Sequence, residues 1–246
     1  MAIAALLAGE NVLLCGGKAT GKNILAENLA WLFRRPTYNI SFHVNTDSST
    51  LIGTDTFRNN EVQLREGPII QCAKTGGFGI LDEINMAKND AVSVLHDVPG
   101  YERVALHPAT RFIGTMNYGY AGTKELNEAL VSRFVVINMP SPDEETLNHI
   151  LKSMYPTLKE SAAEQFVGLF LDLQTKAQNS EISAKALDLR GLLAAIGLMK
   201  IGLSPIRAIH MGVGNKSFDL FEREMVEDII MTRIPSSLEA AEVFED

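Results

Sequence analysis

Cysteine is scarce in this chain, which has only two among its 246 residues. Cys15 and Cys72 form no C-x-x-C spacing and have no paired histidines nearby, so neither a disulfide framework nor a thiolate metal site is expected. Long apolar runs are also missing, and the start, MAIAALLAGE, lacks a basic n-region. We therefore expect a cytoplasmic protein in a reducing compartment, with neither a membrane-spanning helix nor a cleaved signal.

An excess of basic residues is absent too. The chain has 22 Lys and Arg against 30 Asp and Glu, a formal net charge of −8. The first 140 residues carry 13 acidic and 12 basic side chains, whereas residues 141–246 carry 17 and 10. No basic face for nucleic acid is indicated. The acidic second part is either a solvated surface or a docking face for a partner.

Patterns for other kinds of site are missing as well. The five histidines form no i, i+4 pair, so no metal site other than one for Mg²⁺ is expected. No Ser or Cys nucleophile constellation is present. We expect Trp31, Phe33 and Tyr38 to pack in the core or against helices rather than to form a platform for stacking bases.

Short apolar, β-branched segments do alternate with helical patterns through the first part of the chain. The segments that predict strands buried on both faces are 11–16, 37–43, 78–84, 111–117 and 134–140. The segments that predict helices are 21–33, 68–75, 88–97 and 124–133. Such alternation is typical of βαβ units, so we predict an α/β fold with a mostly parallel sheet covered by helices.

The strand pattern stops near residue 140. From SPDEETLNHILKSMY onward a period of 3.6 residues dominates to about residue 230, and Ser141 or Asp143 is a suitable N-cap for the first helix. We therefore predict two domains, an α/β domain at 1–140 and a helical domain at 141–246. The tail, SSLEAAEVFED, is too short and polar to assign.

A glycine-rich loop connects the first predicted strand to the first predicted helix, in LLCGGKATGKNILAENLAWLF (13–33). Gly16, four further residues and then Gly21-Lys22 match the G-x-x-x-x-G-K spacing, in which backbone N–H groups surround phosphates and the lysine holds the β- and γ-phosphates. The next residue is normally a Ser or Thr that ligates Mg²⁺, but here it is Asn23, whose amide oxygen has a longer reach. The alternative is a glycine-rich turn with a chance lysine.

Two carboxylates end the buried strand in FGILDEIN. They would be unfavourable there unless they served a cation and a reacting water. Asp82 would support Mg²⁺, through a water molecule, and Glu83 would polarise the attacking water. The alternative is a pair of acids at the N-terminus of the next helix, favoured by its dipole.

Two more candidates follow in RFIGTMN and NEALVSRF. Asn117 ends a strand and is suited to orient a water or the γ-phosphate, although Asn commonly ends strands. Arg133 stands at the end of a predicted helix. By itself, a cation at a helix C-terminus is well explained by the helix dipole.

Together these segments resemble the AAA+ ATPases, and more narrowly the MoxR-like and dynein-related branch. The family's Walker A loop, Walker B strand, sensor 1 and arginine finger match, in order, residues 16–23, residues 80–83, Asn117 and Arg133. SAKALDLRGLLAAIGL is similar to the lid helix that carries sensor 2, with Arg190 at the matching position. The resemblance runs from about Leu6 to Arg233 and implies a P-loop NTPase fold, a three-layer αβα sheet followed by a C-terminal helical lid.

The resemblance also implies a chemistry. ATP and Mg²⁺ are the implied cofactors, and hydrolysis would depend on Glu83, Asn117, Arg133 and Arg190. The phosphates would be held by Gly16, Gly17, Lys18, Ala19, Thr20, Gly21, Lys22, Asn23 and Ile24. Because the finger works in trans, the expected form is a homo-oligomer, by resemblance a hexameric ring that remodels a protein client beside a von Willebrand factor A domain partner.

Two rival functions stay open. Asn23 favours a nucleotide-switched scaffold that does not hydrolyse ATP. A GTP-using, McrB-type motor shares the same branch, but the chain has no N-K-x-D guanine motif, so ATP is favoured.

Two segments concern insertions that this branch carries. TDTFRNNEVQLREG alternates in strand fashion around Asn59-Asn60 and predicts a hairpin at about 54–66, inserted in the second helix and often facing the ring pore in this branch. A bare hairpin without a pore function is the alternative. A second hairpin of the branch is compressed here to 97–111, and few residues precede the first strand to help enclose an adenine.

Overall fold

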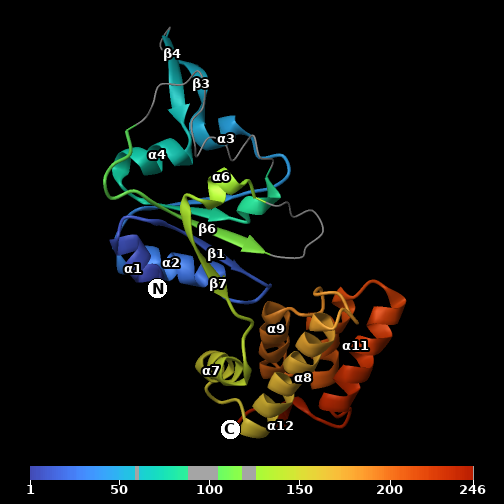
Figure 1. Cartoon of the computed structure of the whole chain (residues 1–246). Coiled ribbons are helices and arrows are strands. Elements are labelled where there is room, and N and C mark those ends of the chain that lie inside the picture. The colour runs from blue at the N-terminus through green and yellow to red at the C-terminus, as the bar shows by residue number, and fades with distance from the viewer. Residues whose placement is uncertain (59–60, 88–104, 118–125, 246) are drawn as a thin grey trace. The chain divides into compact units, whose positions relative to one another are not determined.

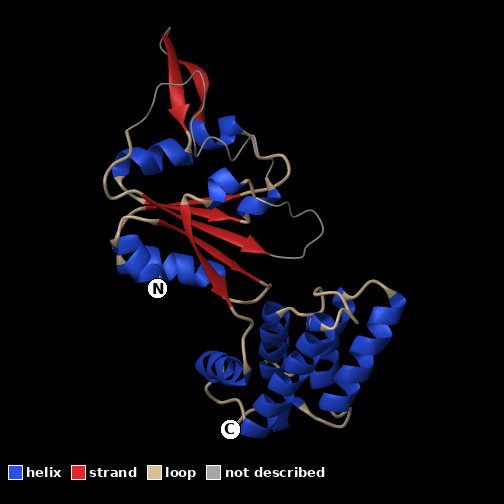
Figure 2. Ribbon diagram, viewed as in Figure 1, coloured by secondary structure: helices blue, strands red, loops and turns tan. Residues whose placement is uncertain are grey.

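The computed structural model describes residues 1–58, 61–87, 105–117 and 126–245. The chain divides into two compact units, Met1–Pro140 and Ser141–Asp246. The first unit contains a sheet covered by helices, and the second is built of helices (Figures 1 and 2). The expected helix at 88–97 lies outside the described residues, as do Asn59-Asn60 and most of the segment 97–111.

A five-stranded parallel sheet forms the centre of the first unit. Its order is β2-β5-β6-β1-β7. The strands are β1 (Asn11–Gly16), β2 (Thr37–Ser41), β5 (Phe78–Asp82), β6 (Arg111–Asn117) and β7 (Phe134–Met139). The predicted α/β fold with a parallel sheet is thus confirmed.

Helices cover both faces of this sheet and complete three layers (Figure 1). On one face, Val12 and Leu14 of β1 pack with residues of α1 (Ala2–Leu7) and α2 (Lys22–Leu32). On the other, Leu13 and Cys15 pack with residues of α3 (Ser48–Ile52), α4 (Pro68–Thr75) and α6 (Glu128–Val131). Successive residues of a strand point to opposite faces, which is why a continuous apolar run builds two cores at once.

The two outer strands differ from the prediction of burial on both faces. In β2 only Ile40 is buried, and in β7 Val135 and Val136 are 40% and 43% exposed. Each of these strands has a neighbour on one side only, so the helices that cover the centre of the sheet protect it less. An apolar run therefore does not distinguish an edge strand from a central one.

Trp31 also differs from its prediction, because its side chain is 78% exposed. The buried face of α2 consists of Lys22, Ala26, Leu29 and Ala30, a helical spacing that leaves Trp31 outside it. The other two aromatics pack as expected. Phe33 contacts Phe78 with ring centroids 5.4 Å apart, and Tyr38 packs against the core.

An antiparallel hairpin projects from the first unit between α3 and α4 (Figure 1). It consists of β3 (Gly53–Arg58) and β4 (Glu61–Glu66), and Phe57 pairs with Val62 across it. Both of these apolar side chains are exposed. The hairpin therefore presents apolar groups that the described part of its own unit does not cover.

The second unit begins with α7, whose N-cap Asp143 accepts a hydrogen bond from the backbone N–H of Thr146 at 2.9 Å. The tail left unassigned from the sequence forms a short helix with a capping box between Glu239 and Glu242. The helices of this unit are α7 (Glu144–Met154), α8 (Glu160–Gln178), α9 (Leu189–Lys200), α10 (Pro205–Gly212), α11 (Leu220–Arg233) and α12 (Ala240–Val243). Within the described ranges, none of the helices combines the length and apolar character needed to cross a bilayer.

Candidate functional site

Three neighbouring strands bring the candidate residues to one edge of the sheet. β1 ends at Gly16, β6 ends at Asn117, and these two residues are paired in the register. β5 lies on the other side of β6 and ends at Asp82. In open α/β sheets this carboxyl edge is where ligands bind, because the loops that follow the strands converge there.

The loop after β1 has the backbone that a phosphate site requires. A Cβ on Gly16 would lie 2.6 Å from the backbone oxygen of Met139, so no side chain fits at this position. Gly21, the N-cap of α2, has φ 77°, and Ala19 has φ 61°, both in the left-handed region. The loop therefore leads directly to the amino end of α2, where free N–H groups and the helix dipole favour an anion.

Lys22 is the buried cation of this loop, with a side chain only 7% exposed. Its ammonium donates to the backbone oxygens of Gly16 and Gly17, at 3.2 and 2.6 Å, and to Thr20 Oγ1 at 3.0 Å. The hydroxyl of Thr20 in turn donates to Gly17 O at 3.1 Å. Three acceptors thus surround the charge, and phosphate oxygens could replace them.

Two opposing effects act on the pKa of the Lys22 ammonium. Burial lowers the pKa of the ammonium, while Cys15, Asp82 and Glu83 raise it by Coulomb attraction. The loop lysine and the two carboxylates at the end of β5 therefore belong to one electrostatic site.

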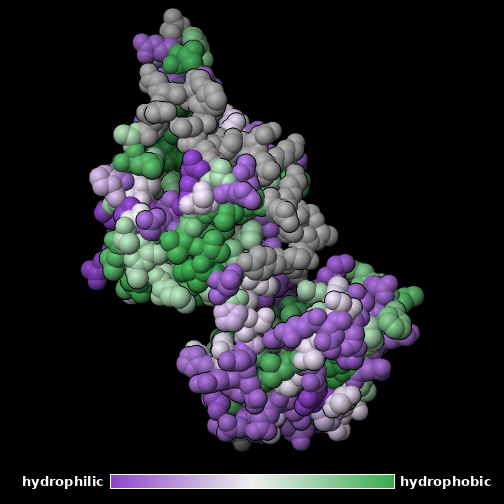
Figure 3. All heavy atoms as spheres, viewed as in Figure 1, coloured by the Kyte–Doolittle hydropathy of each residue, from purple (hydrophilic) through white to green (hydrophobic). Residues whose placement is uncertain are grey.

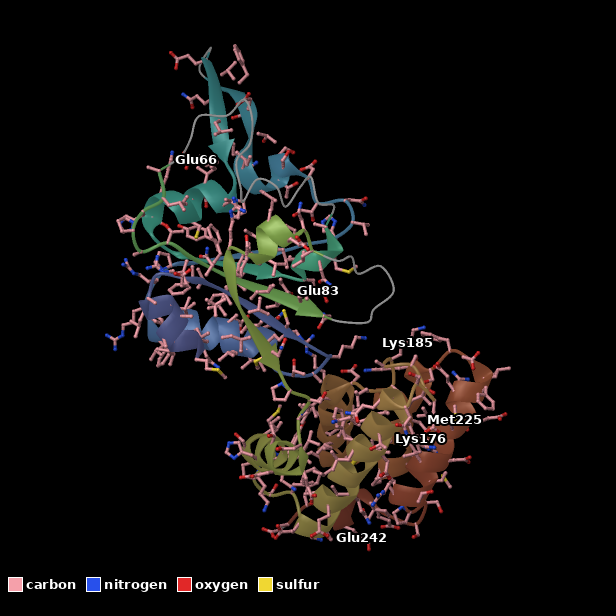
Figure 4. All side chains as sticks on the ribbon, in the orientation of Figure 1. Glu66, Glu83, Lys176, Lys185, Met225 and Glu242 are labelled. Carbon is pink, nitrogen blue, oxygen red and sulfur yellow. The ribbon has the colours of Figure 1, made fainter. Side chains whose placement is uncertain are left out.

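The two carboxylates are linked by one buried hydroxyl on β6. Thr115 Oγ1 donates to Asp82 Oδ1 at 2.6 Å and accepts from the backbone N–H of Glu83 at 3.1 Å. Glu83 itself has φ 53° and ψ 46°, a left-handed conformation that residues other than glycine rarely adopt. The turn after β5 thus directs Glu83 away from the strand line, and Figure 4 shows it at this edge of the sheet.

Asn117 contacts Glu83 directly. Its Nδ2 donates to Glu83 Oε1 at 3.1 Å. Its backbone oxygen accepts from Asn85 Nδ2 at 2.9 Å, and Asn85 is 3% exposed. The loop, Asp82, Glu83 and Asn117 are therefore brought together as the sequence predicted, and their chemical roles stay predictions.

Thr115 and Asn85 were not singled out from the sequence. A signal for Thr115 exists, because it precedes Asn117 by two positions and so lies on the same face of the strand. Asn85 follows the acids in a segment of otherwise apolar character, but nothing in the pattern distinguishes it from an exposed turn residue.

The donor set suits Mg²⁺ rather than a caged metal. Across the described stretches of chain no group of three or more His, Cys, Asp or Glu side chains could hold a metal ion. Mg²⁺ is commonly bound through one or two carboxylates, waters and substrate phosphates, for which Asp82 and the half-buried Asn23 supply hard oxygens. Of the other loop residues, Lys18 is half-buried and Ile24 is 66% exposed.

Arg133 lies at the other end of the strands, beside the amino end of β1. It precedes β7, whose first residue, Phe134, pairs with Asn11, whereas Met139 pairs with Gly16. The length of β1, about 16 Å at 3.3 Å per residue, therefore separates Arg133 from the loop of its own chain. The exposed guanidinium donates to the backbone oxygen of Ala129, the second of the four residues of α6, a contact that agrees with the helix-dipole alternative left open from the sequence.

Arg190 belongs to the second unit, in the first turn of α9. Its backbone N–H donates to the N-cap, Asp188, at 3.0 Å, and its side chain is exposed. Lys216 forms an ion pair with Asp188. Burial raises the pKa of Asp188. The hydrogen bond and charge of Lys216, together with hydrogen bonds from the backbone N–H groups of Gly191 and Arg190, outweigh burial, so the pKa of the carboxyl that caps this helix is lowered.

Comparison with known proteins gives one family model, two similar proteins and one solved structure. The model of the AAA domain, dynein-related subfamily, matches residues 11–134. YojN of Bacillus subtilis (strain 168), described as uncharacterized, is 34% identical over 245 residues, which cover 94% of this chain and 80% of that protein. SAB1265c of Staphylococcus aureus (strain bovine RF122 / ET3-1), also described as uncharacterized, is 31% identical over 237 residues, or 90% and 89% of the two chains. A crystal structure of a Cytophaga hutchinsonii ATCC 33406 protein covers 95% of this chain and 87% of its own, with a TM-score of 0.49 and 16% identity, a similarity too weak to support an argument.

Proposed function

Because the chain belongs to the AAA domain family, in its dynein-related subfamily, we propose that it binds ATP and hydrolyses it to ADP and phosphate as a MoxR-like motor. The observation that carries this proposal is the placement of buried Lys22, in the loop after β1, at the same carboxyl edge of the sheet as Asp82 and Glu83 at the end of β5, whose charges raise the pKa of the ammonium. A cation in a glycine loop suits the phosphates, and paired carboxylates beside it suit a divalent ion and a water.

Each residue would have a defined part in the reaction. Lys22 exchanges its loop acceptors for oxygens of the β- and γ-phosphates, and the N–H groups of the loop hold the same phosphates. Glu83 accepts a proton from the water whose oxygen bonds to the γ-phosphorus, as the bond from that phosphorus to the bridging oxygen breaks and ADP leaves. Asn117, which already contacts Glu83, orients that water or the γ-phosphate.

Mg²⁺ fits this proposal as the second cofactor. It would be held by Asp82 and, directly or through water, by Asn23, and would neutralise charge on the phosphates. In this proposal the proton passes from the attacking water to Glu83, and Mg²⁺ neither gives nor takes it.

The position of Arg133 supports an oligomer. It is too far from its own loop to reach a phosphate there, so it would act on the nucleotide of a neighbouring copy. Exposed apolar side chains support burial between copies, and Figure 3 shows such residues gathered on the first unit over α1, α2 and β7. In the second unit the exposed apolar side chains include Phe218, Leu220 and Phe221. The hexameric ring, the protein client and the von Willebrand factor A domain partner are proposed from the family resemblance.

Asn23 supports one second candidate, a scaffold that changes state on binding ATP without hydrolysing it. An amide in place of the usual hydroxyl weakens the expected support for Mg²⁺. Phosphate release by the assembled protein separates the two functions, and competition between ATP and GTP tests the choice of nucleotide.

The decisive test compares Glu83→Gln with Lys22→Ala. Glutamine retains an oxygen that can accept from Asn117 Nδ2 but cannot take the proton of water, so turnover should fall about 10²-fold or more while ATP still binds. Lys22→Ala should weaken binding itself, because it removes the cation of the loop. Phosphate release gives the first quantity and a fluorescent ATP analogue the second. Nearly normal turnover of Glu83→Gln, or equal ATP affinity of the two variants, would contradict the proposal.

A further inference from the structure

Thr115 lies in the middle of the candidate site without a role assigned to it. It is 1% exposed, and its neighbour Gly114 pairs with Leu81, which places the threonine beside Asp82. Its hydroxyl is used in both directions, since it donates to Asp82 Oδ1 and accepts from Glu83 N–H. The Thr115 side chain is therefore hydrogen-bonded to both acidic residues, to the side chain of Asp82 and to the backbone of Glu83.

The backbone of Glu83 needs such a contact. A left-handed glutamate is disfavoured by its own Cβ and persists only where the surrounding structure holds it. The hydrogen bond from Glu83 N–H to Thr115 holds the backbone at this point, and the hydrogen bond from Asn117 holds the carboxylate. Because Thr115 and Asn117 are two positions apart on β6, their side chains share a face and fix the glutamate at two points.

We propose that Thr115 is a positioning residue for hydrolysis, which sets the backbone conformation from which Glu83 reaches the attacking water. The inference rests on the proposed function. Thr115 touches neither nucleotide nor water in this scheme, so it acts on the chemical step through Glu83 and leaves phosphate binding by the glycine loop unchanged.

The test compares Thr115→Val with Thr115→Ser and with a matched control, Thr110→Val. Thr110 is also buried, immediately precedes β6, and uses its hydroxyl on the backbone oxygens of Cys72 and Ala73, both at 3.2 Å. Thr110→Val therefore removes a buried hydroxyl of the same kind at the other end of the strand, away from both acids.

Thr115→Val should lower kcat about 10- to 100-fold, the range that a small misplacement of a catalytic group produces, with KM and the affinity for a fluorescent ATP analogue changed less than about threefold. Thr115→Ser should restore kcat to within about threefold of the native protein, since it restores the hydroxyl. Thr110→Val should lower the melting temperature without this loss of kcat. Should Thr115→Val fail to fold, Thr115→Ala removes the same hydroxyl with a smaller side chain.

A second measurement asks whether Thr115 acts through Glu83. In a Glu83→Gln background the Thr115→Val change should lower the residual rate much less than in the native background. Equal losses in the two backgrounds, equal kcat losses in Thr115→Val and Thr110→Val, or no rescue by serine would overturn the inference. Native protein that assembles and binds ATP but releases no phosphate would instead contradict the proposed function, and the inference with it.

Discussion

Lys22 shows how a single residue can be prepared for a ligand. A buried ammonium without acceptors would be strongly unfavourable, so the loop supplies two carbonyls and a hydroxyl of its own. If Lys22 holds a phosphate as proposed, binding would exchange one set of oxygens for another and add the attraction of a full negative charge. The lysine would consequently need little desolvation on binding the nucleotide.

Asn23 directly follows Lys22 in the first turn of α2. A Ser or Thr hydroxyl at this place is short enough to meet Mg²⁺ directly, whereas the amide oxygen of Asn stands one atom further from the backbone. Direct coordination would require the ion or the loop to move, and coordination through water is looser. We expect Asn23→Thr to hydrolyse ATP faster and to reach its half-maximal rate at an about tenfold lower Mg²⁺ concentration, the lower end of what changed outer ligands produce.

Titrating Mg²⁺ against both phosphate release and binding of a fluorescent ATP analogue measures this effect, and Asn23→Ala is the control. The alanine variant should need more Mg²⁺ than the native protein if the amide oxygen supports the ion at all. Identical titrations for Asn23 and Asn23→Thr would make Asn23 a neutral substitute. Loss of turnover in Asn23→Thr would mean that the amide has a positive role.

Helices α9 and α10 approach each other closely through their backbones. A Cβ on Gly191 would lie 2.0 Å from the backbone oxygen of Gly212, and one on Gly212 would lie 2.2 Å from that of Gly191. Backbone cannot yield as a flexible side chain does. Gly191→Ala should therefore lower the free energy of unfolding by about 1–3 kcal/mol, despite the better helix propensity of alanine.

Urea unfolding followed by far-UV circular dichroism measures this loss. Gly197→Ala is the control, because it lies in the same helix and its Cβ would meet only the Tyr155 hydroxyl, at 3.1 Å. We expect it to change the free energy of unfolding by less than about 1 kcal/mol. Similar shifts in the two variants would show that the close contact of α9 with α10 is not what excludes a side chain at Gly191.

Elements also differ in how far the sequence predicted them. The central strands β1, β5 and β6 could be placed because burial on both faces leaves a mostly apolar run, and these runs end at Gly16, Asp82 and Asn117. Exposure of β2 and β7 depends on their place at the sheet edges, which is a property of the pairing and not of either segment. Trp31 is similar, since its hydrophobicity does not reveal that the buried face of α2 lies elsewhere.

Some residues of the candidate site could likewise be predicted from the sequence, and others could not. Residues at the ends of strands, such as Asp82 and Asn117, could be brought together because the carboxyl ends of parallel strands meet at a common edge. The contacts of Thr115 could not, because a hydroxyl inside a strand becomes informative only when the neighbouring strand and its register are known.

The proposed role of Arg133 determines whether one chain would suffice for hydrolysis. Because β1 separates it from the loop of its own chain, we expect each subunit to bind nucleotide without it and to need a neighbour's copy for hydrolysis. Arg133→Ala should keep ATP affinity and lose hydrolysis about 10³-fold or more, the range for arginine fingers in well-studied NTPases. Phosphate release and binding of a fluorescent ATP analogue measure the two quantities.

Mixing two inactive variants tests the trans arrangement directly. An Arg133→Ala chain keeps Glu83, and a Glu83→Gln chain keeps Arg133, so a contact between them can bring an intact glutamate to an intact arginine. Co-assembled mixtures should then release phosphate faster than the sum of the separate variants, with each variant assembled alone as the control. Native mass spectrometry of differently tagged chains verifies that mixed assemblies form. If they form and the rate never exceeds that sum, Arg133 does not act on a neighbour, and its supported role is the contact with Ala129 of α6.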